Sequence, residues 1–166
     1  IKECDWSSDV CSSDLCFILP VSKYTPYFLM TWTDLVVKCS QRGHQVMVSQ
    51  QPTRAECFKT CTEEYDAYMC IDPEAVFKPE DVLRLMESPH DATGVIMMSN
   101  NLNELTCGRT MESIIHEHDN PYFQVEKLQP SFVLLQKIPE GWNYVDPIPA
   151  HIDTKIRVGN RVTVVV

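Results

Sequence analysis

Apolar runs alternate with segments of helical period along the first hundred residues, and this alternation constrains the fold more than any other feature of the sequence. The runs at residues 16–21, 46–49, 67–71 and 93–98 are short and suited to buried strands. Because helical segments separate them, the sequence predicts right-handed crossovers and a Rossmann-like α/β fold, with a mainly parallel sheet flanked by helices. In such sheets ligands bind beyond the carboxyl ends of the strands.

The separating segments carry local signals for the start of a helix. The clearest helix begins at Pro26, where Thr25 is suited to be the N-cap. Thr53, followed by Glu56 three residues later, has the pattern of a capping box. Pro79 opens a third helical segment.

The sequence beyond residue 100 has a weaker pattern. Residues 100–120 indicate a surface excursion, and residues 132–137 indicate another buried strand. Residues 155–158 and 163–166 are each typical of a short edge strand or terminal strand.

The first fifteen residues look unlike the rest of the chain. The run at residues 5–15, DWSSDVCSSDL, is polar and rich in serine, and it has no period of 2 or 3.6. It resembles the translated end of a widely used short-read sequencing adapter. We therefore interpret residues 1–15 as a non-native assembly artefact, expect the natural amino terminus to be missing, and take residues 16–166 as a single domain. A natural disordered tail is the alternative.

The charge and the cysteines exclude several classes of function. The net charge of −9 includes −3 from residues 1–15, which leaves −6 for residues 16–166. This balance argues against nucleic-acid binding, which relies on clustered Lys and Arg, but it is compatible with a small anionic ligand. No apolar stretch reaches the length of a membrane span. The six cysteines of residues 16–166 include no C-x-x-C pair, which indicates buried free thiols in a reducing compartment and predicts a cytoplasmic location.

Two carboxylates stand where the apolar run at residues 67–71 ends. Asp72 and Glu74 are separated by Pro73. Carboxylate oxygens are hard ligands that suit Mn²⁺ or Mg²⁺. However, an Asp-Pro pair is also an ordinary way to end a strand in a turn. From these residues alone, a metal site and a simple turn both remain open.

The stretch YDAYMCIDPEAVFKPED at residues 65–81 resembles nucleotide-sugar-dependent glycosyltransferases of the GT-A fold, of the family-2 type. That family usually has a Tyr-Asp pair, an apolar strand, a D-x-D signature, a phenylalanine, and then Pro-Glu-Asp opening a helix. The resemblance covers most of residues 16–166, through CFILPVSKYTPYFLMTW, RAEC, TGVIMM and DTKIRVGN. It implies a GT-A-like domain that transfers a sugar from a nucleotide-sugar donor to a hydroxyl of a carbohydrate or another acceptor.

The resemblance also implies a metal site. Asp72 and Glu74 would coordinate a Mn²⁺ or Mg²⁺ ion that bridges the diphosphate of the donor. Asn160 stands where the family commonly has a histidine that completes the metal shell. An amide oxygen is a weaker ligand for a hard cation than the family's residue, so this departure predicts a weakened site.

Three further residues stand at positions where the family binds the donor. Val21 and Ser22 would meet the nucleotide base, although a plain turn between strand and helix explains them equally well. Arg54 would lie near the donor. Its alternative is a solvated side chain in the first turn of a helix, where a cation opposes the helix dipole.

The segment that supplies the catalytic base in the family is the larger departure in this chain. Between Trp142 and Asp153 the family normally has an acidic pair and a helix, whereas this chain has only NYVDPIPAHI. Asp146 is the nearest carboxylate, with Glu140 behind it, so these two are the candidate catalytic residues. The shortened segment predicts that sugar transfer is impaired.

The acceptor side of the site offers only aromatic residues. Tyr122, Trp142 and Tyr144 either stack against an acceptor sugar or cover the core, and their size favours the core. Two alternatives to an active enzyme therefore stay open. One is a non-catalytic domain that binds a nucleotide sugar or carbohydrate, and the other is an incomplete gene product.

Overall fold

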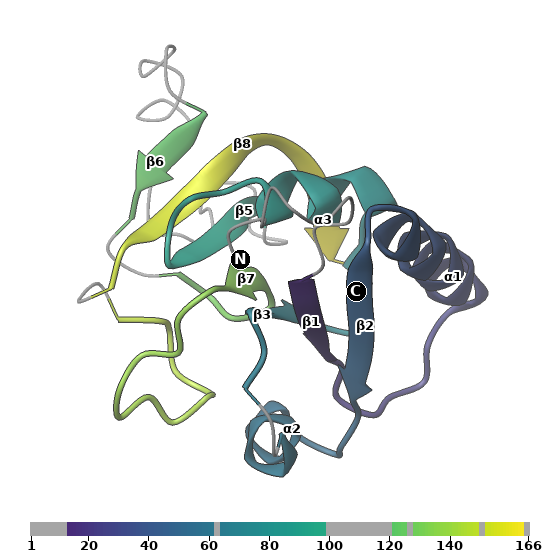
Figure 1. Ribbon diagram of the computed structural model, residues 1–166, viewed down its shortest axis with the longest axis horizontal. Helices are drawn as coiled ribbons and strands as arrows, with labels where there is room; N and C mark the ends of the chain where they lie inside the picture. The colour runs from purple at the N-terminus through teal and green to yellow at the C-terminus, as the bar shows by residue number, and fades with distance from the viewer. Residues whose placement is uncertain (1–12, 62–63, 99–120, 126–127, 150–151, 165–166) are drawn as a thin grey trace, which may run out of the picture.

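The computed structural model describes residues 13–61, 64–98, 121–125, 128–149 and 152–164, and Figure 1 shows how their helices and strands are arranged. The strands form one sheet in the order β2-β1-β3-β7-β5-β8-β4, with β6 beside β8. The elements in chain order are β1 (Ser13–Ile18), α1 (Pro26–Gln41), β2 (His44–Ser49), α2 (Arg54–Thr60), β3 (Ala67–Ile71), β4 (Ala75–Val76), α3 (Pro79–Met86), β5 (Ala92–Met98), β6 (Tyr122–Gln124), β7 (Phe132–Leu135) and β8 (Thr154–Val164).

The sheet is mixed but mostly parallel, as the sequence predicted. Strands β1, β2, β3, β5 and β8 all run in one direction. Strand β7 lies between β3 and β5 and is antiparallel to both. The short strands β4 and β6 also run against β8. The order of the strands in the sheet therefore differs from their order in the sequence.

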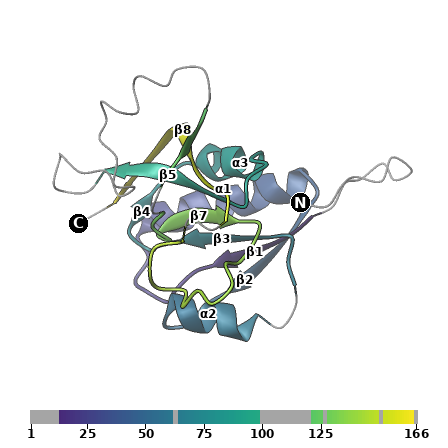
Figure 2. The same ribbon diagram turned by 90° about the vertical axis from the view of Figure 1, so that its left-hand side faces the viewer.

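Helices cover both faces of the sheet, which confirms the predicted α/β architecture. Figure 2 shows α1 and α3 on one face and α2 on the other. The core under α1 and α3 includes Phe17, Leu35 and Met69, whereas Phe58 and Trp142 belong to the core under α2. None of the helices in the described ranges is long and apolar enough to cross a membrane.

The starts of the helices follow the predicted local signals. The hydroxyl of Thr25 accepts a hydrogen bond from the Phe28 amide at 3.1 Å, and Pro26 opens α1. The hydroxyl of Thr53 accepts from the Glu56 amide at 3.2 Å and caps α2. These bonds satisfy amides that have no partner inside the helix.

The amino-terminal segment takes part in the sheet, which corrects one expectation. Strand β1 begins at Ser13, so residues 13–15 belong to the sheet, whereas the sequence predicted that the domain begins at residue 16. Leu15 is buried between Val46 of β2 and Ala67 of β3. Its apolar side chain extends the run that we placed at residues 16–21, and the strand ends three residues earlier, at Ile18. The origin of the segment in an adapter stays a prediction.

In the carboxyl-terminal half, the strands begin and end at other residues than the sequence predicted. The two short strands expected at residues 155–158 and 163–166 are one strand, β8, whose pairing with β5 shifts register between Val95 and Met97. The strand expected at residues 132–137 ends at Leu135. The surface excursion predicted for residues 100–120 lies outside the described residues.

Candidate functional site

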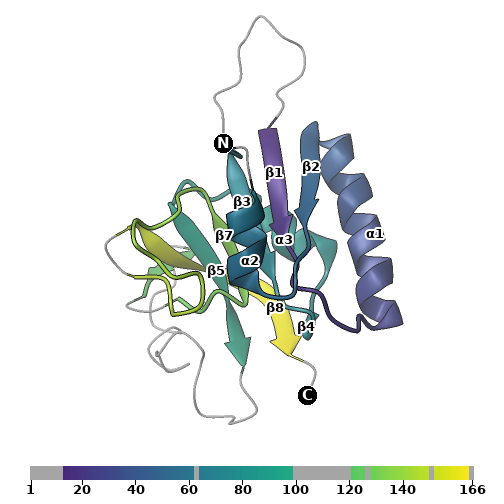
Figure 3. The same cartoon turned by 90° about the horizontal axis from the view of Figure 1, so that it is seen from below.

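The carboxyl ends of β1, β2 and β3 meet at one edge of the sheet, because both β2 and β3 pair with β1 in parallel (Figure 3). Val21 and Ser22 follow β1, and Asp72 follows β3, so all three lie at this edge, as the sequence predicted. The Val21 amide donates to the Gln51 carbonyl at 2.8 Å and continues the pairing of the first two strands beyond their ends. Val21 and Ser22 are both exposed.

An ion pair joins α2 to the end of β3. The Arg54 Nη2 atom lies 2.5 Å from Asp72 Oδ1, and the side chains are only 16% and 28% exposed. Arg54 is the first residue of α2, so the N-cap at Thr53 fixes the place from which its side chain reaches across. Arg54 is therefore not a solvated side chain in a first turn. It brings a positive charge to the carboxylate at the sheet edge.

A tight turn presents the two acids at this edge. The Ala75 amide donates to the Asp72 carbonyl at 3.0 Å, which closes the turn through Pro73 and Glu74. The Asp72 amide donates to the Ser131 carbonyl at 2.8 Å and anchors the turn to the segment before β7. Asp72 is partly buried, while Glu74 is exposed. The turn, one of the two alternatives that the sequence offered, is therefore present, and the metal site stays a prediction.

Burial and the neighbouring charges have opposing effects on the pKa of Asp72. Burial raises the pKa of Asp72 above its ordinary value of 3.8, and the Arg54 guanidinium acts in the opposite direction. The neighbouring Glu74 carboxylate raises the pKa of Asp72 further, because two like charges are held close together. A cation at this turn would relieve the repulsion between the two acids.

The donors at the turn fit a divalent cation only in part. The described residues contain no group of three His, Cys, Asp or Glu side chains that could hold a metal ion. Asn160 lies in β8, which reaches the turn through the pairing of Val164 with Ala75, although the described side chains do not include that of Asn160. Two hard oxygen donors are present, and Arg54 offsets one of their two charges. Binding of a cation by the chain alone is therefore expected to be weak.

Arg54 also has a donor without a partner. Its Nε atom is buried and makes no hydrogen bond to any atom in the described part of the chain. A buried donor without an acceptor costs about 1–3 kcal/mol. The arginine therefore keeps hydrogen-bonding capacity beyond what Asp72 uses.

Tyr24 lies at the same edge, and the sequence reasoning missed it. Its hydroxyl donates to the Pro20 carbonyl at 2.5 Å and accepts from Gln50 Nε2 at 3.4 Å. Burial is the main cause that raises the pKa of Tyr24, and the Glu74 carboxylate adds to it. The signal in the sequence was its place two residues after Ser22, between the first strand and the capped helix.

The two candidate catalytic acids belong to a loop that packs on α2. Asp146 accepts a hydrogen bond from Asn143 Nδ2 at 2.7 Å, and its carbonyl accepts from Trp142 Nε1 at 2.8 Å. Glu140 is exposed. Within the described residues, no hydrogen bond or ion pair joins either acid to Asp72. The structure thus places Val21, Ser22, Arg54, Asp72 and Glu74 at one edge of the sheet, whereas Asp146 and Glu140 belong to a separate loop.

The aromatic residues of this loop cover the core. Trp142 is 8% exposed and meets Phe58 of α2 edge to face, with ring centroids 5.7 Å apart. Tyr144 stacks on Phe58 at 4.8 Å, and its φ of 67° shows that the loop turns sharply there. Tyr122 lies elsewhere, in β6, beside His90. This arrangement favours the core interpretation for Trp142 and Tyr144.

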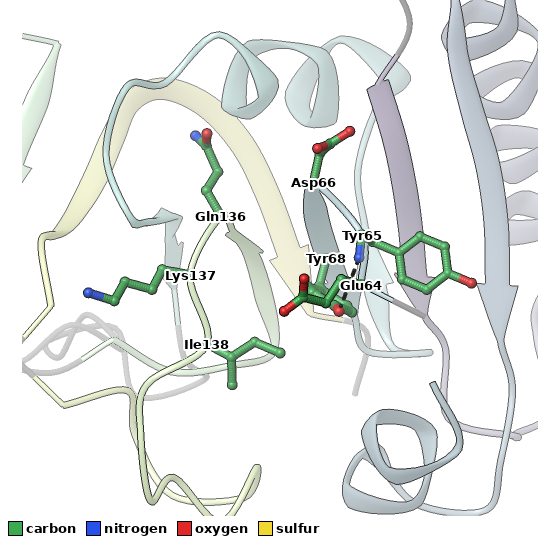
Figure 4. Close-up of a pocket in the computed structure, with 7 residues that line it drawn as sticks. All are labelled: Glu64, Tyr65, Asp66, Tyr68, Gln136, Lys137 and Ile138. Atoms are coloured by element: carbon green, nitrogen blue, oxygen red, sulfur yellow. Dashed lines mark hydrogen bonds between the residues drawn. The ribbon is translucent and has the colours of Figure 1, made fainter. Parts of the chain in front are cut away.

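A cavity of about 710 Å³ lies at the opposite end of β3, as Figure 4 shows. Seven described residues line it: Glu64, Tyr65, Asp66, Tyr68, Gln136, Lys137 and Ile138. None of the residues that we predicted as site residues is among them. We place the candidate site at the other edge, because the partly buried ion pair and the two acids lie there.

Comparison with known proteins adds one similarity of fold. No protein-family model matches the chain, and no curated protein matches it. Among solved structures, the chain is similar to the inositol-1-phosphate CTP transferase from T. maritima, with 13% sequence identity and a TM-score of 0.39. The alignment covers 90% of this chain and 69% of that chain. At this level the similarity carries no argument about the activity of this chain.

Proposed function

We propose that this chain is a metal-assisted transferase domain of the GT-A type, which binds a nucleotide-sugar donor at the carboxyl edge of β1, β2 and β3. The observation that carries the proposal is the partly buried ion pair between Arg54 and Asp72 at that edge. An arginine held beside two carboxylates suits a ligand that is both anionic and bound to a cation. The diphosphate of a nucleotide sugar is such a ligand.

Each residue at the edge has a role in this proposal. Asp72 and Glu74 would hold Mn²⁺ or Mg²⁺, with Asn160 as a further oxygen ligand. The bound cation would neutralise the charge that develops on the departing nucleoside diphosphate. Arg54 orients Asp72, and its positive charge would attract the anionic ligand. Because Arg54 offsets one carboxylate charge, cation and diphosphate should each bind better when the other is present.

Val21 and Ser22 complete the donor side. Both are exposed at the end of β1, and the bond from the Val21 amide to Gln51 holds this part of the chain in place. A preformed, exposed backbone at a strand end suits the flat face of a nucleotide base.

Binding without efficient transfer is the second candidate function. The observation that favours it is the hydrogen bond from Asn143 to the Asp146 carboxylate, within a loop held on α2 by Trp142 and Tyr144. A catalytic base has to reach the acceptor hydroxyl, and such a base typically contributes 10²–10⁴-fold in rate. Asp146 meets this condition only if the loop rearranges. We therefore propose that donor binding and hydrolysis exceed transfer.

The test measures thermal stability with Mn²⁺, with each of the common nucleoside diphosphates, and with both together. The expected result is a rise in Tm with both ligands that exceeds the sum of the separate rises. Asp72→Asn should abolish this excess, whereas the matched control Glu87→Gln, an exposed acid at the end of α3, should keep it. An equal excess in the Asp72→Asn chain, or no response to any nucleotide, would contradict the proposal.

Transfer is measured separately from binding. Nucleotide-sugar hydrolysis and transfer to a panel of acceptor sugars are followed by release of the nucleoside diphosphate. Binding with hydrolysis but little transfer supports an impaired transferase, and binding alone supports the second candidate. Strong transfer that survives both Asp146→Ala and Glu140→Ala would show that the base lies elsewhere or that the mechanism is a retaining one.

A further inference from the structure

Two cysteines that the proposed function does not use face each other on the α2 side of the sheet. The Sγ atoms of Cys16 and Cys61 are 3.8 Å apart, although the residues are 45 positions apart in the sequence. Cys16 lies in the middle of β1, and Cys61 is the C-cap of α2. The two sulfurs are therefore in van der Waals contact, and a disulfide would bring them to about 2.05 Å.

The pair is accessible to small molecules. An opening of about 350 Å³ is lined by both cysteines, together with polar residues that include Ser49, Gln50 and Thr60. Cys61 is half-buried, while Cys16 is buried. A reagent that enters the opening therefore meets the Cys61 thiol first and finds the Cys16 thiol behind it.

The third cysteine nearby points elsewhere. Cys57 lies one helical turn before Cys61, and its thiol is directed toward the Gln51 carbonyl at 3.9 Å. The Cys61 thiol itself donates to the Cys57 carbonyl at 3.2 Å. Because the described residues contain no cluster of three metal-binding side chains, the three thiols do not form a closed metal site there. Of the three thiols, those of Cys16 and Cys61 are therefore the pair that could form a disulfide.

We propose that Cys16 and Cys61 are a site of thiol-disulfide exchange with low-molecular-weight disulfides, which ends in a disulfide between β1 and the end of α2. The Cys61 thiolate attacks one sulfur of the reagent, forms a mixed disulfide, and releases the first reagent thiolate. The Cys16 thiolate then attacks the Cys61 sulfur and releases the second. Two protein thiols are oxidised, the reagent is reduced to two thiols, and these take up the two protons.

The structure determines which step is slow. Burial raises the pKa of the Cys16 thiol to about 12, and the adjacent Cys61 adds to the shift. At neutral pH only a small fraction of Cys16 is the thiolate that attacks, so closure of the disulfide limits the rate. The mixed disulfide on Cys61 should accumulate first, and the rate of closure should rise about tenfold per pH unit below pH 12.

The disulfide would also change the stability of α2. It would tie the end of this short helix to the middle of the sheet and constrain the unfolded chain between two residues that are 45 positions apart. For a loop of this length, the chain-entropy estimate corresponds to a rise in Tm of about 8–16 °C. The α2 helix begins with Arg54, so the exchange site lies at the opposite end of this helix from the donor site. Gln50, which lines the opening, also donates to Tyr24 at the donor edge.

The test incubates the full chain with glutathione disulfide at pH 8 and at pH 9, and follows intact mass and disulfide-linked peptides. We expect a glutathione adduct on Cys61, then an intramolecular disulfide between Cys16 and Cys61 that forms about ten times faster at pH 9. The Cys16→Ser chain should stop at the adduct, and the Cys61→Ser chain should form neither product. The matched control Cys57→Ser should close at the wild-type rate.

Several results would overturn the proposal. These are a wild-type chain that stays reduced or stops at the adduct, a closed product that joins Cys57 to Cys61, and any other pairing as the main product. Cys61 lies outside the sheet and is half-buried, so the Cys61→Ser chain keeps the test informative even if Cys16→Ser prevents folding. Circular dichroism of each variant establishes that it is folded before the exchange is measured.

Discussion

Removal of residues 1–12 and removal of residues 1–15 should have very different effects on stability. The adapter resemblance predicts that the first twelve residues add nothing to the fold. The next three residues belong to β1, where Leu15 is buried between β2 and β3. Asp14 also exchanges two hydrogen bonds with Asp66, one from its amide at 2.8 Å and one to its carbonyl at 3.0 Å.

The expected magnitude follows from these contacts. Burial of one leucine side chain contributes about 1.5–3 kcal/mol. Each hydrogen bond contributes about 0.5–1.5 kcal/mol net, and at least the two bonds between Asp14 and Asp66 are lost. Removal of residues 1–15 should therefore lower the free energy of unfolding by roughly 3–6 kcal/mol. Since a domain of this size is stable by only about 5–15 kcal/mol, the shorter chain should be close to unfolding at room temperature.

The assay is urea denaturation followed by circular dichroism for the full chain and the two truncated chains. A Leu15→Ala variant of the full chain isolates the side chain, and it should lose about 2–5 kcal/mol. The slope of the transition should stay the same for the full chain and the chain without residues 1–12, since the same surface is exposed on unfolding. If the chain without residues 1–15 is within about 1 kcal/mol of the full chain, β1 does not begin at Ser13 in solution.

Three further predictions concern single residues. Joint binding of Mn²⁺ and nucleoside diphosphate needs the ionised Asp72, whose pKa is raised on folding, so the gain in Tm should diminish as acidification protonates this carboxyl group. The free chain has the opposite dependence on this group, whose contribution to stability is present below its unfolded pKa and lost as the pH rises. Gly94→Ala should lower the free energy of unfolding in urea by about 1–3 kcal/mol, because the new Cβ would lie 2.5 Å from Cδ1 of the buried Leu128. Asp146→Ala should reduce transfer while the affinity for the nucleoside diphosphate, measured by calorimetry, stays unchanged.

Local signals in the sequence predicted the helices and the central strands well. The hydroxyls of Thr25 and Thr53 need only neighbours three residues away to make their bonds, so the sequence determines these caps directly. The strand at residues 67–71 is bounded by acids and a proline, and its limits agree with β3. Such features depend on interactions within one turn or one strand, so local sequence patterns are enough to predict them.

Non-local pairing explains most of what the sequence did not predict. Strand β7 lies between β3 and β5 because Phe132 pairs with Ile71, and no local pattern records a partner sixty residues away. Strand β8 is continuous because it pairs with β5 on both sides of a register shift. Short strands such as β4, at residues 75 and 76, exist only through the partner that they pair with.

In the candidate site, too, the features that depend on local patterns were predictable and the long-range contacts were not. Parallel pairing of β1, β2 and β3 was predictable, and it places Ser22 and Asp72 at one edge. The ion pair between Arg54 and Asp72 was not, because it depends on how α2 lies across the sheet. The sequence named both residues through a family resemblance, but their direct contact comes from the structure. Tyr24 was missed because its contacts to Pro20 and Gln50 have no sequence pattern.

The packing of the loop at residues 139–149 explains why binding should exceed catalysis in this chain. The donor residues depend on strand ends and on the first turn of α2, which pairing and capping hold in place. Asp146 depends instead on Trp142, whose indole donates to its carbonyl and packs against Phe58. If Asp146 moved to the sheet edge, this hydrogen bond and the aromatic contact would be lost, at about 0.5–1.5 kcal/mol each. A substrate that supplies this energy on binding would recover transfer, so the rate should depend on the acceptor far more than donor affinity does.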